Sequence, residues 1–250
     1  MQVPWRFPTH AANPVDMTSP NQLPNPDAEA ALLRHRQAIE RVLVDHDFAY
    51  DSDALLQAKL RFMATECKRV LDVGQSTRQH IQLFQRDRVD TMEINRGEPL
   101  ADIIDDICAP TRLASDRYDG IVCLSVLEHV YDPFAAIGHI HRLLPEGGYL
   151  LLHLPFLFRY HAPADLRFSD AYRFSRDGMA WLLRDFSEVT LYSIRGPWSS
   201  VFNLNRSWKN GLEKRLGMRV SRWLDSAGNR LFRRPTSHLQ VSGYYAWARK

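Results

Sequence analysis

The chain has 250 residues, of which 45% are hydrophobic and 24% are charged, and this composition is that of an ordinary globular protein. Its length suits one domain with a sizeable core plus additional segments. The formal net charge of +3 is too small to indicate a nucleic-acid partner by itself, because such proteins concentrate a larger basic charge on one surface.

Cysteine usage and the first residues point to a compartment. Cys67, Cys108 and Cys123 are odd in number and widely spaced, which favours a reducing environment over a disulfide framework. Prolines and polar residues interrupt the first eight residues, which therefore lack the apolar core of a signal peptide. We expect a cytoplasmic protein.

The predicted elements begin after a leader. Residues 1–27 are rich in Pro and Asn and lack periodicity, so we expect them to be extended or disordered and a single domain to occupy residues 28–250. Short apolar runs then alternate with amphipathic stretches, which is typical of a parallel sheet with crossover helices. The predicted helices cover residues 28–44, 52–66, 77–85, 133–144 and 176–184, and the predicted strands cover residues 69–73, 89–94, 103–107, 120–125, 149–154, 188–194 and 241–249.

The exit of the first of these strands carries the first chemical signal. Residues 70–76 read VLDVGQS, and a glycine at a strand exit lets the backbone approach a ligand. Glu93 stands 21 residues after Asp72, at the end of the next strand, where nucleotide-binding folds place a carboxylate for ribose hydroxyls. The pair predicts a site for a ligand that contains a ribose.

Two later segments carry the most specific pattern. Residues 118–130 read YDGIVCLSVLEHV, and residues 141–152 read HRLLPEGGYLLL. Together with the first loop, they resemble the class I S-adenosylmethionine-dependent methyltransferases, specifically the type 11 methyltransferase domain group, over residues 69–194. The resemblance implies a Rossmann-like, seven-stranded, mostly parallel α/β sheet with helices on both faces. This chain would add N-terminal helices and a helical insertion before the last strand.

The resemblance also implies that the cofactor is S-adenosylmethionine, and it suggests which residues contact it. Carboxylates suit its hydroxyl and amino donors, and an apolar neighbour covers the purine. The implied contacts are Asp72, Gly74 and Gln75 around the methionine part, Glu93 at the ribose, Asp106 and Ile107 at the adenine, and Leu124 and Ser125 through their backbone. The chain departs from the family at Ser76 and Arg78, which stand where the second and third glycines of the loop are usual.

A segment beyond the fifth strand is similar to a subset of this group. Residues 155–161 read PFLFRYH and residues 170–179 read DAYRFSRDGM. Ligands of doubly wound sheets lie outside the carboxyl ends of the strands, and this segment follows such an end. We therefore expect Asp170, Tyr172 and Arg173 to contact the acceptor.

Two histidines are candidates for a catalytic base. Methyl transfer from a sulfonium requires alignment of donor and acceptor, and a hydroxyl acceptor also requires a base. His129 follows the fourth strand, and His161 shares a polar, aromatic loop with Asp165 and Asp170. For His129, a purely structural role in ordering the loop is an equal alternative.

Asp105 and Asp106 are adjacent carboxylates that raise the question of a metal site. No further carboxylate or histidine stands at metal-ligand spacing beside them. We therefore expect no bound metal.

The insertion at residues 197–238 is basic and amphipathic. Residues 206–234 contain nine Lys and Arg against Glu213 and Asp225, a net charge of +7, with Trp and Leu interleaved. Such a segment either packs on the domain as a lid with a solvated basic face or lies on an anionic membrane, which would suit a lipid-linked acceptor and a location at the inner face of the membrane. Nucleic-acid binding is a weaker alternative.

The sequence thus predicts transfer of a methyl group from S-adenosylmethionine to a small-molecule, glycan or lipid-linked acceptor, with oxygen expected from the resemblance. One rival is a non-catalytic relative that acts through the basic insertion, motivated by the altered glycine loop. A second is a nicotinamide-dependent oxidoreductase, which shares the first turn and the acidic residue but fits poorly with Arg78.

Overall fold

The computed structural model describes residues 26–45, 52–77, 79–94, 101–162, 168–204, 211–232 and 239–250. The chain divides into two units, residues 1–37 and residues 38–250. Helix α1 (Pro26–Arg41) begins in the first unit, and every element after it belongs to the second. Residues 1–25 of the predicted leader lie outside the described residues.

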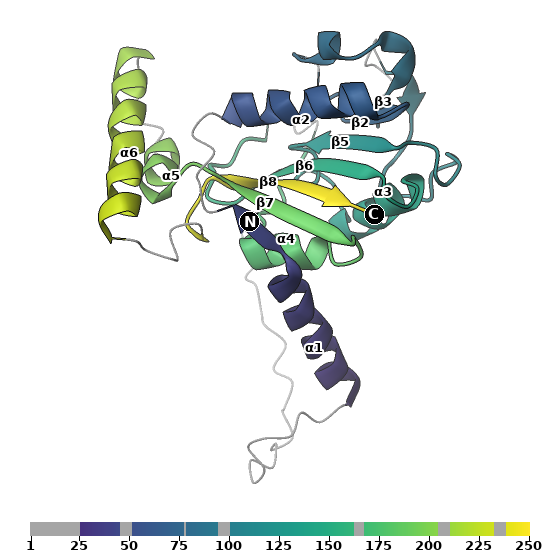
Figure 1. Ribbon diagram of the computed structural model, residues 1–250, viewed down its shortest axis with the longest axis horizontal. Helices are drawn as coiled ribbons and strands as arrows, with labels where there is room; N and C mark the ends of the chain where they lie inside the picture. Colours follow the sequence, from purple (N-terminus) through teal and green to yellow (C-terminus); the bar gives the residue numbers. More distant parts are fainter. Residues whose placement is uncertain are drawn as a thin grey trace, which may run out of the picture. The chain divides into compact units, whose positions relative to one another are not determined.

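Eight strands of the second unit form one sheet in the order β1-β7-β8-β6-β5-β2-β3-β4 (Figure 1). Neighbouring strands are parallel, except that β8 runs antiparallel to both β6 and β7. The strands are β1 (Leu43–Asp45), β2 (Val70–Val73), β3 (Val89–Glu93), β4 (Ile103–Ile104), β5 (Gly120–Leu124), β6 (Tyr149–Pro155), β7 (Glu188–Ile194) and β8 (Gly243–Arg249). The predicted mostly parallel sheet is confirmed, with one strand more than the expected seven.

The additional strand is β1, which sequence reasoning placed inside a helix. The helix predicted over residues 28–44 ends at Arg41, and β1 pairs with β7. Val42 is buried, Leu43 is exposed and Val44 packs against the core, so the side chains alternate as in a strand. The open edge of β7 supplies the hydrogen-bonding partner that a local pattern does not reveal.

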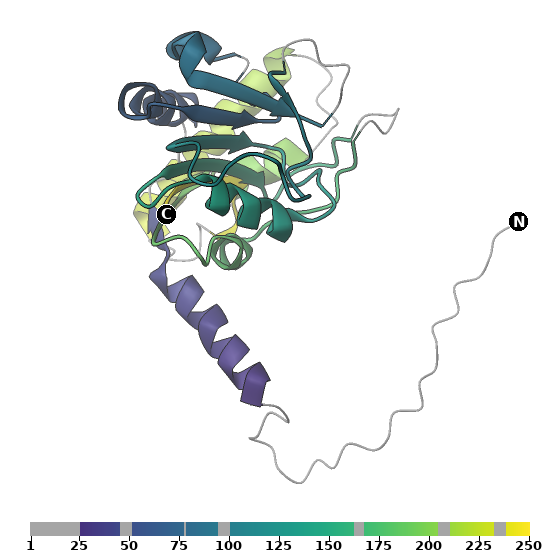
Figure 2. The same cartoon turned by 90° about the vertical axis from the view of Figure 1, so that its right-hand side faces the viewer.

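Helices cover both faces of the sheet, as predicted (Figure 2). Helix α2 (Ser52–Glu66) packs through Leu60 and Met63 on one face. Helices α3 (Pro133–Leu143) and α4 (Arg176–Leu182) pack on the other face, where Ile140 and Met179 are fully buried. The two apolar clusters therefore lie on opposite sides of the central strands.

The start of α3 illustrates why these residues form these elements. The side chain of Asp132 caps the helix by accepting hydrogen bonds from the backbone N–H groups of Phe134 and Ala135. Pro133 occupies the first helical turn, where its missing N–H costs nothing. The helix is thus fixed directly behind the exit of β5.

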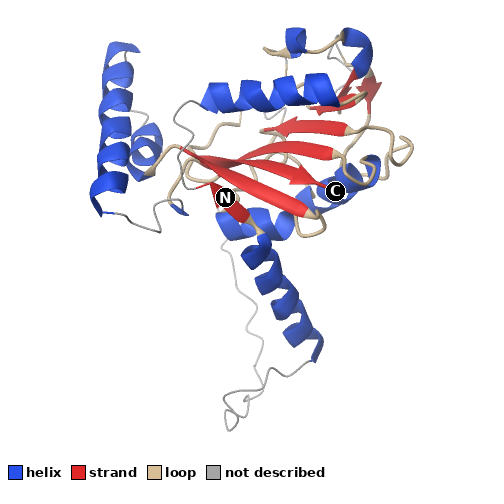
Figure 3. Cartoon of the chain, in the orientation of Figure 1, coloured by secondary structure: helices blue, strands red, loops and turns tan. Residues whose placement is uncertain are grey.

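One predicted helix is wrong. The described residues of this range, 77 and 79–85, form turns and the 3₁₀ helix η1 (Ile81–Leu83), followed by a second 3₁₀ helix, η2 (Arg86–Arg88), before β3 (Figure 3). Ile81, Leu83 and Phe84 pack against the α2 side of the core. The apolar spacing that resembled a helix reflects this packing.

The predicted helical insertion before the last strand is confirmed. It contains α5 (Pro197–Leu204) and α6 (Gly211–Phe232), which lie side by side (Figure 1). Gly217 of α6 lies against the ring of Phe202 of α5. Among the described helices, none combines the length and the apolar character needed to cross a bilayer.

Candidate active site

A pocket of about 690 Å³ lies at the carboxyl ends of β2, β3 and β5. These strands flank the point where the strand order reverses, because β3 lies on one side of β2 and β5 lies on the other. Ligands of doubly wound sheets bind at such a point. The pocket is lined by Val73, Gly74, Met92, Glu93, Ile94, Asp105, Asp106, Ile107, Cys108, Ser125, Val126, His129, Val130, Tyr131, Phe168 and Ser169.

The loop after β2 is held by Asp72. One carboxylate oxygen accepts hydrogen bonds from the backbone N–H and hydroxyl of Ser76, and the other accepts the equivalent pair from Thr77. Burial raises the pKa of Asp72, although these four hydrogen bonds oppose that effect. Asp72 and the buried Gln75 are not among the residues that line the pocket, so the carboxylate shapes the loop from behind.

Gly74 is the part of this loop that lines the pocket. Its φ is +72°, and its N–H donates to the carbonyl of Met92 on β3. A Cβ here would lie 2.6 Å from Cγ2 of Val126, which also lines the pocket. The glycine thus allows the loop to pass close to the exit of β5.

Three acidic residues line the wall opposite this loop. Glu93 ends β3, and its carbonyl accepts a hydrogen bond from the N–H of Asp105. Asp106 accepts hydrogen bonds from the N–H of Cys108 and from the hydroxyl of Tyr131, at 2.9 Å each. Ile107 is 6% exposed and lies beside them. A carboxylate next to an apolar wall fits a ribose and a purine.

Of the two residues expected to border the cofactor at the exit of β5, only one lines the pocket. Ser125 lines the pocket, has a φ of +56°, and its hydroxyl lies 2.7 Å from Nδ1 of His153. Leu124 is not among the lining residues and packs against the α2 side of the core. Burial lowers the pKa of His153 to about 4, so this imidazole is neutral at physiological pH.

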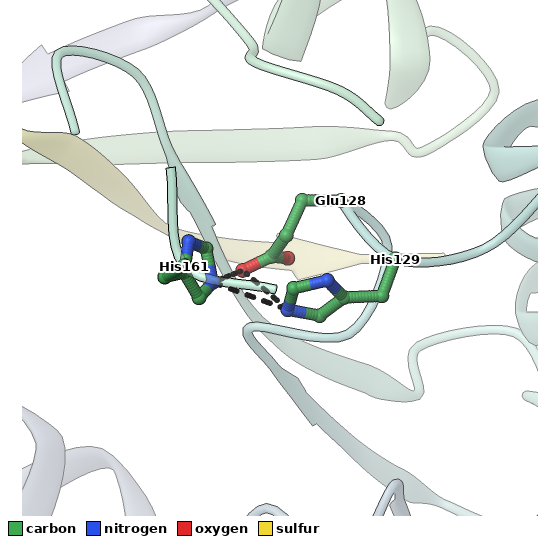
Figure 4. Close-up of side chains that lie close together, drawn as sticks. All are labelled: Glu128, His129 and His161. Atoms are coloured by element: carbon green, nitrogen blue, oxygen red, sulfur yellow. Dashed lines mark hydrogen bonds and ion pairs between the residues drawn. The ribbon is translucent and has the colours of Figure 1, made fainter. Parts of the chain in front are cut away.

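Beyond Ser125, three side chains converge (Figure 4). Nε2 of His129 lies 3.2 Å from Nε2 of His161. Oε1 of Glu128 lies 3.8 Å from the first of these nitrogens and 3.9 Å from the second. His129 also lines the pocket, whereas His161 and Glu128 are not among the lining residues.

The surroundings orient both rings. Nδ1 of His129 faces the carbonyl of Ser169, and Nδ1 of His161 lies 3.1 Å from Oδ2 of Asp170. Asp170 is also bound by the guanidinium of Arg173, whose hydrogen bonds lower the pKa of Asp170 to about 2. Asp170 therefore stays charged and faces His161.

Burial changes the acid–base properties of Glu128 and His129. Burial raises the pKa of Glu128 to about 7. The backbone N–H of Glu128 and the charge of Arg173 oppose this effect of burial only in part. Neither carboxylate oxygen of Glu128 accepts a hydrogen bond from another described residue. The pKa of His129 is lowered, chiefly by burial, so its imidazole is neutral near pH 7.

The residues expected to contact the acceptor lie close to this cluster. The hydroxyl of Tyr172 donates to the carbonyl of Tyr131, and Arg173 donates to the carbonyls of Phe158 and Arg159 as well as to Asp170. Neither residue lines the pocket, and neither does Asp170. Their contacts fix the loop that carries His161.

Five of the eight residues expected to contact the cofactor line the pocket, whereas Glu128 was not among the predicted site residues. The missed residue stands in the same LEHV motif as His129, and it is fully buried although its side chain is ionisable. A carboxylate at the end of a continuous apolar run was the available signal. Asp165 and Arg78 lie outside the described residues.

The comparisons with known proteins identify the family and the fold. A family model described as a methyltransferase domain matches residues 46–195, and no curated protein matches the chain. The chain is similar to a putative methyltransferase from Haloferax volcanii, solved with the Trm112 activator, with 14% identity, 89% of this chain and 96% of that chain covered, and a TM-score of 0.50. It is also similar to a methyltransferase from Archaeoglobus fulgidus, with 17% identity, 80% and 95% covered, and a TM-score of 0.49.

The family model covers more than half of the chain, and the likeness to the H. volcanii structure supports the same fold. The methyltransferase family expected from the VLDVGQS and LEHV motifs is therefore confirmed. The chain belongs to the methyltransferase domain family and is an S-adenosylmethionine-dependent methyltransferase of class I fold.

Proposed function

We propose that the chain transfers the methyl group of S-adenosylmethionine to a hydroxyl of a small-molecule, glycan or lipid-linked acceptor. One observation carries the proposal. Glu93 and His129 line the same pocket. The carboxylate of Glu93 can accept hydrogen bonds from the donor's ribose, and the imidazole of His129 can accept a proton from the acceptor. A displacement reaction needs both partners held in one cavity in a fixed orientation.

The donor occupies the end of the pocket between Gly74 and Asp106. Glu93 accepts hydrogen bonds from the ribose hydroxyls, Asp106 with Ile107 holds the adenine, and the close backbone at Gly74 receives the methionine part. Ser125 borders the donor at the exit of β5. Asp72 and Gln75 act through the shape of the loop, which Asp72 fixes by four hydrogen bonds.

The acceptor lies at the other end, beside His129, Phe168 and Ser169. His129 is neutral near pH 7 because burial lowers its pKa, and its Nδ1 faces a carbonyl, so its Nε2 carries a lone pair. The pair of His129 and His161 is placed to take up the proton that a hydroxyl loses as it is methylated. Asp170, Tyr172 and Arg173 hold the loop that completes this end.

The donor site is tested by calorimetric titration with S-adenosylmethionine and with its demethylated product, using a nicotinamide dinucleotide as control. We expect Glu93→Ala to weaken both affinities at least tenfold, because two hydrogen bonds to a charged acceptor are lost. Glu146→Ala, at an exposed turn, is the matched control and should bind as the wild type does. Unchanged affinity of Glu93→Ala would refute the assignment of the ribose site.

The acceptor class is tested with a methyl-labelled donor. Candidate alcohols, phenols, glycans and lipid-linked intermediates are incubated with the enzyme, and the labelled product is identified by mass spectrometry and by the NMR shift of its methyl carbon. A methyl ether or ester supports the proposal. A product methylated only on nitrogen, sulfur or carbon refutes transfer to oxygen.

We also propose that the insertion contacts an anionic membrane. Leu216, Val220 and Trp223 are 62%, 50% and 67% exposed and share one face of α6. On α5, Trp198 and Val201 are exposed as well. An exposed apolar stripe on a helix of net positive charge is typical of helices that lie in the membrane interface.

Vesicle flotation tests this contact. We expect Arg219→Gln and Arg222→Gln each to weaken binding to anionic vesicles by about 1 kcal/mol, or roughly fivefold, and Trp223→Ser to weaken it further. The controls are Arg61→Gln on α2 and vesicles without anionic lipid. Equal binding by all variants, or no binding of the wild type, would refute the membrane contact and favour the alternative in which the insertion is a lid packed on the domain.

A further inference from the structure

The side chains of Glu128, His129 and His161 direct their electron-pair donors at one point (Figure 4). They come from two segments, the exit of β5 and the loop after β6. The backbone carbonyl of Glu128 accepts hydrogen bonds from the N–H groups of Ala171 and Tyr172, which ties the two segments together. The convergence is therefore built into the fold.

The hydrogen bonds around the rings leave both facing nitrogens without protons. A neutral imidazole carries one N–H. Nδ1 of His129 faces the carbonyl of Ser169, and Nδ1 of His161 faces Asp170, so in the neutral form of each ring these acceptors favour the tautomer with its proton on Nδ1. The two Nε2 lone pairs then lie 3.2 Å apart, next to a fully buried carboxylate. Such a group of donors repels itself unless a cation lies between them.

A single proton does not satisfy this group. It could join the two nitrogens, but the oxygen of Glu128 lies 3.8 and 3.9 Å from them, beyond hydrogen-bonding distance. Both oxygens of Glu128 would remain buried without a hydrogen bond from another described residue, which costs free energy.

A metal ion of the zinc type matches the spacing. Two nitrogens that each lie about 2.05 Å from a tetrahedral ion are about 3.3 Å apart, close to the 3.2 Å between the Nε2 atoms. The carboxylate would need to approach by roughly 0.5 Å. The partners of the two Nδ1 atoms, a carbonyl and a carboxylate, are those that orient metal-binding histidines.

We propose that Glu128, His129 and His161 form a binding site for one divalent zinc-type ion at the acceptor end of the pocket. Two imidazoles and one carboxylate are donors that such an ion prefers. When Glu128 binds the ion as a carboxylate, the charges of Glu128, Asp170 and Arg173 sum to −1, so the divalent ion leaves a net charge of +1. This inference replaces the expectation of no metal, which considered only Asp105 and Asp106.

The role of the ion rests on the proposed function. With three protein ligands, a position remains for a further oxygen, and His129 lines the acceptor end of the pocket. The net positive charge favours loss of the hydroxyl proton to water, and the resulting oxyanion attacks the donor's methyl group and displaces the thioether of the demethylated donor. When the ion is bound, it replaces the two histidines as the group that activates the hydroxyl, because their Nε2 lone pairs then bind the ion. Alcohols and phenols are the acceptors whose reaction the ion would accelerate most, because their hydroxyl groups must lose a proton.

The site is tested on the full chain, purified without a polyhistidine tag. After treatment with a chelator, the protein is titrated calorimetrically with Zn²⁺, and the bound metal is counted by mass spectrometry. We expect one ion per chain and a loss of affinity of at least tenfold in Glu128→Gln and in His161→Gln. Asp170→Asn, which removes the carboxylate facing His161, should lower the affinity about 10- to 100-fold. His141→Gln, on α3 with its ring at the carbonyl of Asp185, is the matched control.

A second measurement does not depend on the variants. Co²⁺ bound by two nitrogens and a carboxylate in a tetrahedral site gives an intense visible absorption, which an octahedral surface site does not. Absence of that band, or equal zinc affinity in the wild type and in Glu128→Gln and His161→Gln, would overturn the proposal.

Failure here is distinguishable from failure of the proposed function. Methyl transfer to a hydroxyl by the chelator-treated protein, without zinc binding, refutes the metal site and retains the proposed reaction. Zinc binding without any methylated oxygen product refutes the proposed reaction and retains the site.

Discussion

At Gly74, the fold and the donor site depend on the absence of a side chain. The residue has a φ of +72°, and a Cβ would lie 2.6 Å from Cγ2 of Val126. Gly74→Ala is expected to lower the free energy of unfolding by about 2–4 kcal/mol, from the left-handed backbone and from overpacking. It should also weaken binding of S-adenosylmethionine. Chemical denaturation and calorimetric titration measure the two effects.

Gly138 provides the matched control, because nothing lies within 4 Å of a Cβ at this exposed position in α3. Gly138→Ala should raise the free energy of unfolding by about 0.5–1 kcal/mol, since alanine favours a helix. Adding Val126→Ala to Gly74→Ala removes the clash and should restore part of the stability. A Gly74→Ala protein as stable as the wild type would contradict the close approach of the loop to Val126.

The individual residues that sequence reasoning found were those fixed by spacing along neighbouring strands. Gly74 and Glu93 end two adjacent parallel strands, so both line the pocket. Glu128 was missed because its significance depends on His161, which lies 33 residues further along and reaches it only through the loop after β6. A local sequence pattern does not reveal a contact between residues that are so far apart in the chain.

Among the elements, α5 owes its start to a side chain from α6. Asp225 is 3% exposed and accepts hydrogen bonds from the N–H groups of Trp198 and Ser199, at 2.9 and 3.1 Å. Asp225→Ala leaves these first-turn groups without partners, so we expect a loss of about 1–2 kcal/mol. Hydrogen exchange should show faster opening of α5, whereas α2 should be unchanged.

Two further variants define that prediction. Asp225→Asn keeps one acceptor oxygen and should lie between alanine and the wild type. Ser226→Ala, at the next position of α6, should have little effect on exchange in α5. If the amides of α5 were equally protected in Asp225→Ala, the carboxylate would not be what holds the start of this helix.

The strands and the long helices could be predicted because their apolar periodicity also describes their burial. The helix α2 has the predicted bounds, whereas the described residues among 77–85 do not form the predicted helix. The hydrogen bonds from Ser76 and Thr77 to Asp72 direct the chain into a turn. Pairing of β1 with β7 likewise joins residues about 150 positions apart, beyond the range of a local pattern.

For the whole molecule, the pocket and the convergent side chains share one edge of the sheet, while the opposite ends of the same strands are joined by Asp90 of β3. Its Oδ2 accepts hydrogen bonds from Arg69, just before β2, and from the hydroxyl of Tyr118, just before β5. Burial raises the pKa of Asp90, but these hydrogen bonds and the charge of Arg69 outweigh it, so the net pKa is lowered.

This network predicts part of the acid sensitivity of the fold. Because the pKa of Asp90 is lower in the folded state than in the unfolded state, its stabilising effect is fully present above an unfolded pKa of about 3.9 and is lost as the pH falls through the folded value. Arg69 is 45% exposed, so solvent screens the pair and Asp90→Asn should cost only about 1 kcal/mol at pH 7.

Urea unfolding of the wild type and of Asp90→Asn at several pH values measures this contribution. The difference in the free energy of unfolding should be constant from pH 7 to about pH 5 and should shrink as the pH falls below about 4, because the protonated wild-type carboxyl then resembles the amide. Asp87→Asn, at an exposed position three residues earlier, is the control. A difference that persists undiminished at low pH would mean that Asp90 stabilises the sheet through packing, and not through its charge.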